Sequence, residues 1–182
     1  MKLTAGQILS TPGQIEENIG KHLDVIRLAA SRGADVLVFP ELSLTGYEPG
    51  LAQALAVQPA DQRFDQFQLA SDRYGMLIAV GVPTKGAKGT EISMLCFQPG
   101  LERTSHSKQQ LHPDELPFFT AGTEQLVLRH ADQLLAPAIC YESLQTSHAE
   151  QAAASGAGVY LASVTKGRSD QLTTDARHYR LM

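Results

Sequence analysis

The sequence has few cysteines and no long apolar run, and these absences exclude several classes of protein. Only two cysteines, Cys96 and Cys140, occur among 182 residues, so the chain has neither a disulfide framework nor a C-x-x-C redox pair. No apolar run reaches the roughly 18 residues of a membrane span, and residues 1–7 are too polar for a signal peptide. We therefore expect a cytoplasmic protein with two free thiols.

An excess of positive charge is also absent. The formal net charge is −4, and no basic patch interleaved with aromatic residues occurs. This pattern argues against a nucleic acid or an anionic membrane surface as the partner. The hydrophobic content of 43% and the length suit one globular domain with a sizeable core.

Strand-like and helix-like segments alternate along the chain, which favours a sheet covered by helices. Thr11 is expected to cap the first helix, with Pro12 in its first position, and Gly33 and Gly75 are expected to end two helices. The turn at 99–100 and the loop 130–132 are expected to join antiparallel pairs. The predicted strands are 3–9, 35–39, 76–82, 90–98, 101–107, 125–129 and 133–139, and the predicted helices are 12–32, 51–57, 64–74 and 172–182.

Cys140 follows the short apolar segment 134–139 and precedes an alanine-rich helical stretch. A cysteine at such a junction lies near backbone N–H groups and the positive end of a helix dipole, which lower a thiol pKa and can bind an oxyanion. A free cysteine is also commonly buried as a small apolar side chain. Position alone leaves both interpretations of Cys140 open, whereas Cys96, inside the strand-like run 92–97, is interpreted as part of the core.

Two charged residues also follow strand-like segments. Glu41 comes after the apolar run 36–39 and Pro40, at the kind of sheet edge where ligands bind, and partial desolvation there would raise its pKa and suit a general base. Lys108 follows the segment 101–107 and could place a positive charge beside a developing oxyanion. Taken alone, each residue is better explained as a solvated lysine or a capping glutamate, because most charged residues are exposed.

Taken together, these segments resemble the nitrilase superfamily of carbon–nitrogen hydrolases, whose triad is Glu, Lys and Cys in that chain order. The resemblance extends from Met1 to about Arg180. The matching motifs are 39–42 with Gly46 and Tyr47 (the glutamate motif), Lys108 with Leu111, Glu115, Phe119 and Gly122 (the lysine motif), 139–142 (the cysteine motif) and 156–163 (the strand after the nucleophile helix).

The resemblance implies a mixed α/β fold, a four-layer αββα sandwich, with one carbon–nitrogen hydrolase domain over residues 1–182. The family fold normally continues with further strands and a C-terminal tail, which this chain would lack. The chain is therefore expected to be either a fragment or a naturally short member of the family.

The reaction implied by the resemblance is hydrolysis of a small linear amide, in preference to a nitrile, through a thioester on Cys140. Glu41 would be the base, Lys108 would stabilise the oxyanion, and Glu115 would be an accessory catalytic residue. No metal or cofactor is implied. The oxyanion and substrate contacts would be Tyr47, Tyr141, Glu142, Val164 and Thr165.

The chain departs from the family pattern at two places. His106 stands where the family often has an aromatic residue, and 145–150 lacks the usual proline–glutamate pair and arginine. These departures affect the expected substrate class and the anchoring of the nucleophile helix, and they leave the triad intact. His106 and His112, near Asp114 and Glu115, do not have the spacing of a zinc site.

Two other functions stay open at this point. A truncated family member could act as a non-catalytic scaffold or subunit. A thiol redox protein using Cys140 is less favoured, because the chain has no C-x-x-C partner. The resemblance also implies a homodimer or larger homo-oligomer that associates through helix faces.

Overall fold

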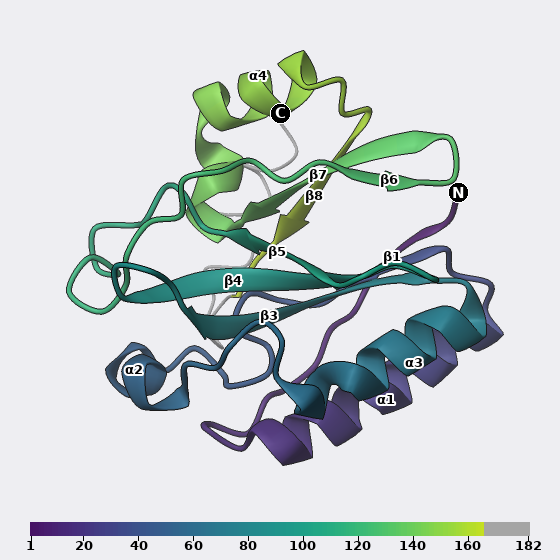
Figure 1. The fold of residues 1–182 in the computed structure, drawn as a ribbon, viewed down its shortest axis with the longest axis horizontal. Coiled ribbons are helices and arrows are strands. Elements are labelled where there is room, and N and C mark those ends of the chain that lie inside the picture. The colour runs from purple at the N-terminus through teal and green to yellow at the C-terminus, as the bar shows by residue number, and fades with distance from the viewer. Residues whose placement is uncertain (166–182) are drawn as a thin grey trace, which may run out of the picture.

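The computed structural model describes residues 1–165, so the predicted helix at 172–182 lies outside the described part of the chain. Its elements form four layers, with two sheets facing each other and helices on both outer faces (Figure 1). Helices α1 (Ile15–Ser31) and α3 (Asp65–Tyr74) cover the larger sheet, and α4 (Thr146–Ala154) covers the smaller sheet. The αββα arrangement that the resemblance implied is confirmed.

The larger sheet has five strands in the order β1-β2-β3-β4-β5. The first three strands pair in parallel, β4 pairs antiparallel with β3, and β5 pairs antiparallel with β4. All residues of β3 except the last are buried, which explains why the strand is apolar from Leu77 to Pro83 rather than alternating. The strands are β1 (Leu3–Ala5), β2 (Val36–Val38), β3 (Leu77–Lys85), β4 (Thr90–Phe97) and β5 (Thr104–Ser107).

The smaller sheet has the order β6-β7-β8. Strand β6 (Leu128–His130) pairs antiparallel with β7 (Gln133–Ile139) around a turn in which Ala131 has a φ of 51°. Strand β8 (Val159–Ser163) pairs in parallel with β7, because α4 returns the chain to the same edge. The 3₁₀ turn η3 (Cys140–Leu144) connects β7 to α4.

Short helical segments lie in the connections of the larger sheet. These are η1 (Pro49–Leu51), α2 (Ala52–Leu55) and η2 (Gln62–Phe64). None of the helices in residues 1–165 is both long and apolar enough to cross a membrane.

The first helix begins later than predicted. Thr11 is not its cap, because the Asn18 side chain accepts from the Thr11 N–H and donates to the Thr11 carbonyl, each at 2.8 Å. Gly13 has a left-handed φ of 70°, so the helix can start only after it, at Ile15. The predicted helix ends are confirmed, since Gly33 and Gly75 also have positive φ angles just past α1 and α3.

Three predicted strands are shifted or too long. Strand β1 ends at Ala5 rather than Leu9, and β5 begins at Thr104 because the turn at 99–100 extends further than expected. Strand β6 begins at Leu128 rather than Gln125. The segment before it forms no strand, and the Gln125 side chain there donates to the backbone carbonyls of Leu126 and Pro137.

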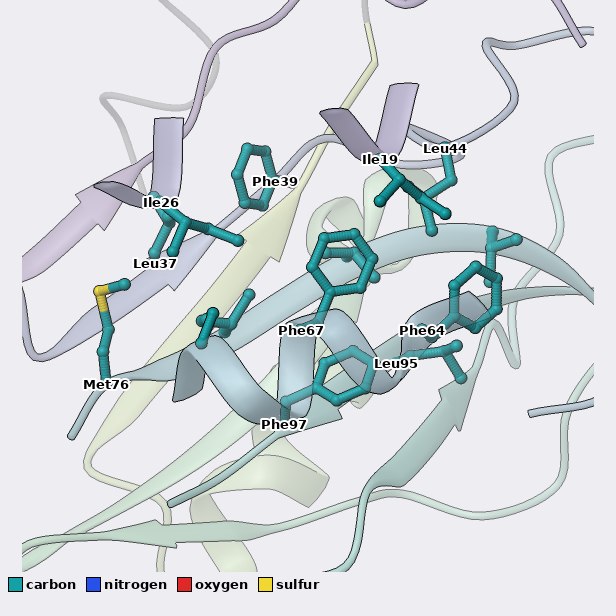
Figure 2. Packing of buried hydrophobic residues seen from close by; sticks show 14 of the residues in the cluster. Ile19, Ile26, Leu37, Phe39, Leu44, Phe64, Phe67, Met76, Leu95 and Phe97 are labelled. Carbon is teal, nitrogen blue, oxygen red and sulfur yellow. The ribbon is translucent and has the colours of Figure 1, made fainter. Parts of the chain in front are cut away.

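Two apolar clusters fill the spaces between the layers. The first lies between the larger sheet and helices α1 and α3 (Figure 2). The second lies between the two sheets and includes Cys96, which confirms the interpretation of this cysteine as core. Alternate residues of β3 and β4 contribute to the two clusters, as the two-residue period of a strand requires. The first cluster is built mainly from Ile19, Ile26, Leu37, Phe39, Leu44, Phe64, Phe67, Met76, Leu95 and Phe97.

Candidate active site

Glu41 lies in the turn that follows β2 and is only 2% exposed. This turn packs directly on β3, where Phe39 donates to the carbonyl of Ala79 at 2.9 Å and Leu44 donates to that of Gly81 at 2.9 Å. The next residue, Leu42, has a φ of 51°, and its buried side chain holds this uncommon conformation in place. The turn therefore presents the carboxylate at the carboxyl end of β2 in a rigid setting.

Lys108 follows β5 and is completely buried. Its Nζ atom lies 2.7 Å from Oε1 of Glu41 and 2.7 Å from Oε1 of Glu115. Backbone hydrogen bonds fix it on both sides, because its N–H donates to Ile92 and its carbonyl accepts from Gly122, each at 2.8 Å. One ammonium group thus joins two carboxylates that are far apart in sequence.

Glu115 is held by further donors in a turn that precedes Phe119. The backbone N–H of His112 donates to its Oε2 at 2.7 Å, and the Tyr47 hydroxyl donates to its Oε1 at 3.2 Å. Tyr47, which the resemblance suggested as a substrate contact, is therefore hydrogen-bonded to Glu115. Burial is the main reason why the pKa of Tyr47 is raised, so its hydroxyl stays protonated.

Cys140 stands at the junction of β7 and η3, as the sequence predicted. Its φ of 49° is uncommon for a residue other than glycine and marks a sharp turn in the chain at this point. The thiol is partly buried. The expected lowering of its pKa is wrong, because burial and then the nearby Glu41 charge raise the pKa of Cys140 to about 12.

The charges of these groups depend on one another. Burial raises the pKa of Glu41, as predicted, and Lys108 offsets part of that rise. Burial opposes a charge on Lys108, but Glu41 and Glu115 outweigh it and raise the pKa of this ammonium. Within residues 1–165, Oε2 of Glu41 has no hydrogen-bond partner, so one carboxylate oxygen stays free to accept a proton. The site thus combines a thiol, two carboxyl groups and an ammonium group.

Glu142 occupies a different position from the one expected for a substrate contact. Its carboxylate is completely buried and accepts from the backbone N–H groups of Ile139 at 2.7 Å and Gln109 at 2.5 Å. Burial alone would raise the pKa of Glu142, but these bonds and His106 outweigh it, so the pKa is lowered. The structure therefore gives this carboxylate backbone partners in place of a substrate.

The remaining predicted contacts lie around the same site. Thr165 donates its hydroxyl to the backbone carbonyl of Glu41, and the adjacent Val164 is half-buried. Tyr141 is half-buried as well, with its ring centroid 5.2 Å from that of His112. Residues from both sheets therefore meet at one place.

Sequence reasoning missed a histidine pair beside Glu142. His106 and His148 are both buried, and their ligand atoms and those of Glu142 lie within 4.8 Å of one another. In residues 1–165 this is the group that could hold a metal ion, and it differs from the His106–His112 pair considered from the sequence. Nothing in the sequence around His148 indicated this position, because only the packing of α4 against η3 brings His148 to Glu142.

Three comparisons with known proteins bear on this site. The family model for carbon–nitrogen hydrolases matches residues 2–180. The glutamine-dependent NAD(+) synthetase of Thermotoga maritima is 26% identical over 166 residues, which cover 88% of this chain and 29% of that protein. The synthetase of the same name from Aquifex aeolicus is 36% identical over 85 residues, 46% of this chain and 15% of that protein. The chain thus spans less than a third of the length of these relatives.

Solved structures of similar fold include an amidase from Nesterenkonia sp., a mutant of which was determined in complex with butyramide. That structure has a TM-score of 0.81 and 24% identity, and the match covers 94% of this chain and 68% of that one. The glutamine-dependent NAD+ synthetase from Acinetobacter baumannii has a TM-score of 0.79 and 18% identity, covering 96% of this chain and 34% of that one. At these identities the similarity is one of fold.

Proposed function

Because the chain belongs to the carbon–nitrogen hydrolase family, we propose that it hydrolyses the carbon–nitrogen bond of a small linear amide through a thioester on Cys140. The observation that carries the proposal is the buried Lys108 ammonium, 2.7 Å from both Glu41 and Glu115, at the site that also contains the thiol. A nucleophile, a base and a cation in one buried site are what acyl transfer requires.

In the first half of the reaction, the Cys140 sulfur attacks the amide carbon while Glu41 takes the thiol proton. A resting thiol needs such a base, since the pKa of Cys140 is about 12. The negative charge that develops on the amide oxygen is stabilised by Lys108 and the backbone N–H of Tyr141. Glu41 then returns the proton to the departing nitrogen, and ammonia or an amine leaves.

In the second half, water attacks the thioester carbon and releases the carboxylic acid. Glu41 takes a proton from this water and returns it to the sulfur, which restores the thiol. Glu115 keeps Lys108 oriented throughout, since its Oε1 accepts a second hydrogen bond from the ammonium beside that to Glu41. No metal or cofactor takes part in either half of this scheme.

The test is release of ammonia from acetamide, propionamide and butyramide by the purified chain. We expect Cys140→Ala, Lys108→Ala and Glu41→Gln each to lower kcat/KM by about 1000-fold or more, because each removes a group acting directly in the transition state. Cys96→Ala is the matched control, since this thiol lies in the core between the sheets, and its variant should keep the activity. Full activity in Cys140→Ala would contradict the proposal.

A second candidate reaction is hydrolysis of the glutamine side-chain amide, with ammonia passed to another domain or subunit. The similarity to two glutamine-dependent NAD(+) synthetases favours it. A kcat/KM for L-glutamine at least tenfold above that for butyramide would support this candidate, and the reverse order would support the simple amidase. Absence of release from every amide by a folded chain would instead favour the non-catalytic scaffold.

A further inference from the structure

A single carboxylate joins the two backbone segments that carry the nucleophile and the catalytic cation. Glu142 accepts from the N–H of Ile139 at 2.7 Å and from the N–H of Gln109 at 2.5 Å. Ile139 immediately precedes Cys140, and Gln109 immediately follows Lys108. Each oxygen of Glu142 is thus bonded to a residue adjacent to a catalytic one.

No ladder of backbone hydrogen bonds could make this connection. Lys108 extends from β5 of the larger sheet, whereas Cys140 extends from β7 of the smaller sheet, and these strands belong to separate sheets. Apolar packing between sheets restrains spacing only loosely, since it has no directional bond. A carboxylate that accepts from both segments fixes their separation by two short bonds.

One buried histidine is hydrogen-bonded to the carboxylate, and a second lies beside it. Nε2 of His106 is 3.1 Å from Oε2 of Glu142, and because an ionised carboxylate only accepts, this nitrogen carries the proton. Nε2 of His148 faces the other oxygen, Oε1, at 3.6 Å, and its Nδ1 is 2.7 Å from the Tyr160 hydroxyl. Side chains from β5 and α4 thus lie against this carboxylate, and Tyr160 of β8 holds the second histidine.

The connection requires the ionised carboxylate of Glu142 and not only a side chain of the same shape. Among residues 1–165 no lysine or arginine lies within salt-bridge distance of Glu142, so its stabilising contacts are the His106 ring N–H and the two backbone N–H donors. Replacing one oxygen by an amide NH₂ would set a donor against the N–H of Ile139 or Gln109. Two donors facing each other repel, and a buried N–H would lose its acceptor.

We propose that Glu142 is a positioning residue, oriented by His106, that sets the distance between the Cys140 sulfur and the Lys108 ammonium. The inference rests on the proposed amide hydrolysis for its catalytic consequence. A displacement of about 1 Å between reacting groups costs about 100-fold in rate. The consequence for the thiol itself, however, can be measured without any amide.

The experiment compares Glu142→Gln and Glu142→Asp with Glu150→Gln, an exposed residue of α4, as the matched control. In Glu142→Gln we expect kcat for amide hydrolysis to fall about 100-fold with KM changed less than threefold. Glu142→Asp retains an acceptor of the same charge, so its kcat should be at least tenfold higher than that of Glu142→Gln. Glu150→Gln should match the parent chain.

The independent readout is the rate at which iodoacetamide alkylates Cys140 as a function of pH, with Cys140→Ala defining the background from Cys96. Displacement of Lys108 and Glu41 relative to the sulfur should shift this profile in Glu142→Gln but not in Glu150→Gln. If the parent chain hydrolyses no amide and the profile still shifts, the proposed function fails and the positioning role stands.

Two results would overturn the positioning role. One is an unshifted alkylation profile in folded Glu142→Gln, and the other is a lowered melting temperature with kcat per folded molecule unchanged. Should Glu142→Gln not fold, His106→Gln and His106→Leu replace it, because glutamine can keep the donor that leucine removes. The profile should then shift in the leucine variant and return in the glutamine variant, and equal profiles would overturn the inference.

Discussion

His22 is a buried side chain that links helix α1 to the turn carrying Glu41. Its Nδ1 donates to the Asn18 carbonyl at 2.6 Å, its Nε2 is 2.9 Å from the Ser43 hydroxyl, and its ring lies 4.2 Å from that of Phe39. Ser43 in turn accepts from the backbone N–H of Gly81. The turn that carries Glu41 is therefore fastened to helix α1 through a neutral imidazole.

This arrangement predicts a loss of stability in acid. Burial lowers the pKa of His22 from 6.5 to about 4, so the folded chain takes up this proton only near pH 4, whereas the unfolded chain takes it up near pH 6.5. The contribution is fully present above pH 6.5 and is lost as the pH falls toward 4. At about 1.4 kcal/mol per pH unit, the free energy of unfolding should decrease by about 3 kcal/mol.

Urea denaturation at pH 7, 6, 5 and 4 measures this effect. His22→Leu should show a shallower decrease than the parent chain, even if its stability at pH 7 is lower. His130→Gln, at the half-buried end of β6, is the control and should follow the parent curve. Parallel curves for the parent chain and His22→Leu would show that His22 does not titrate as inferred.

At the scale of elements, two glycines allow turns to pack closely enough to form the site. A Cβ on Gly81 of β3 would lie 2.4 Å from the Leu42 nitrogen and 2.5 Å from the Pro40 carbonyl oxygen, so the Glu41 turn could not rest on this strand. A Cβ on Gly122 would lie 2.4 Å from the carbonyl oxygen of Ser107, the residue before Lys108. Backbone atoms cannot move aside as flexible side chains do.

We therefore expect Gly81→Ala to lower the free energy of unfolding by about 2–4 kcal/mol, because the added methyl group overpacks the turn. Amide hydrolysis per folded molecule should fall about 100-fold as Glu41 is displaced. Gly20→Ala is the matched control, at an exposed position of helix α1 where a Cβ meets nothing within 4 Å. That variant should gain about 0.5–1 kcal/mol and keep its activity, and equal behaviour of the two variants would contradict the argument.

At the scale of the whole molecule, helix α4 forms an outer layer (Figure 1). Its exposed side includes the small residues Ala149, Ala153 and Ala154, followed by Ser155, beside the longer Glu150 and Gln151. A surface of small residues lets another helix approach closely. Together with the family resemblance, this supports the prediction of a homodimer formed through α4.

Sedimentation at micromolar concentration tests this prediction. The parent chain should sediment as a dimer or larger species, and Ala153→Glu should shift it toward a monomer of about 20 kDa, since a charge in a close helix contact is costly. Gln66→Glu adds the same charge to the exposed face of α3 and should leave the assembly unchanged. A parent chain that is monomeric throughout would contradict the prediction.

Much of the fold follows from local sequence. The apolar runs before Glu41 and Cys140 determine buried strands, and the glycines after α1 and α3 end these helices, because these effects act within a few neighbouring residues. The predicted start of α1 was wrong because the side chain of Asn18, seven residues away, makes two hydrogen bonds with the backbone of Thr11. A capping motif in the sequence does not show whether another side chain will bind the same backbone groups.

The candidate site likewise has features that local sequence predicts and features that depend on contacts between distant segments. The sequence by itself determined that Glu41, Lys108 and Cys140 would each follow a strand, and their motifs indicated a common chemistry. Only the tertiary structure decided that Lys108 contacts both Glu41 and Glu115, that the thiol pKa rises rather than falls, and that Glu142 binds backbone N–H groups. The physical reason is that burial and charge proximity depend on distances between segments far apart in the chain, which the packing of two sheets establishes.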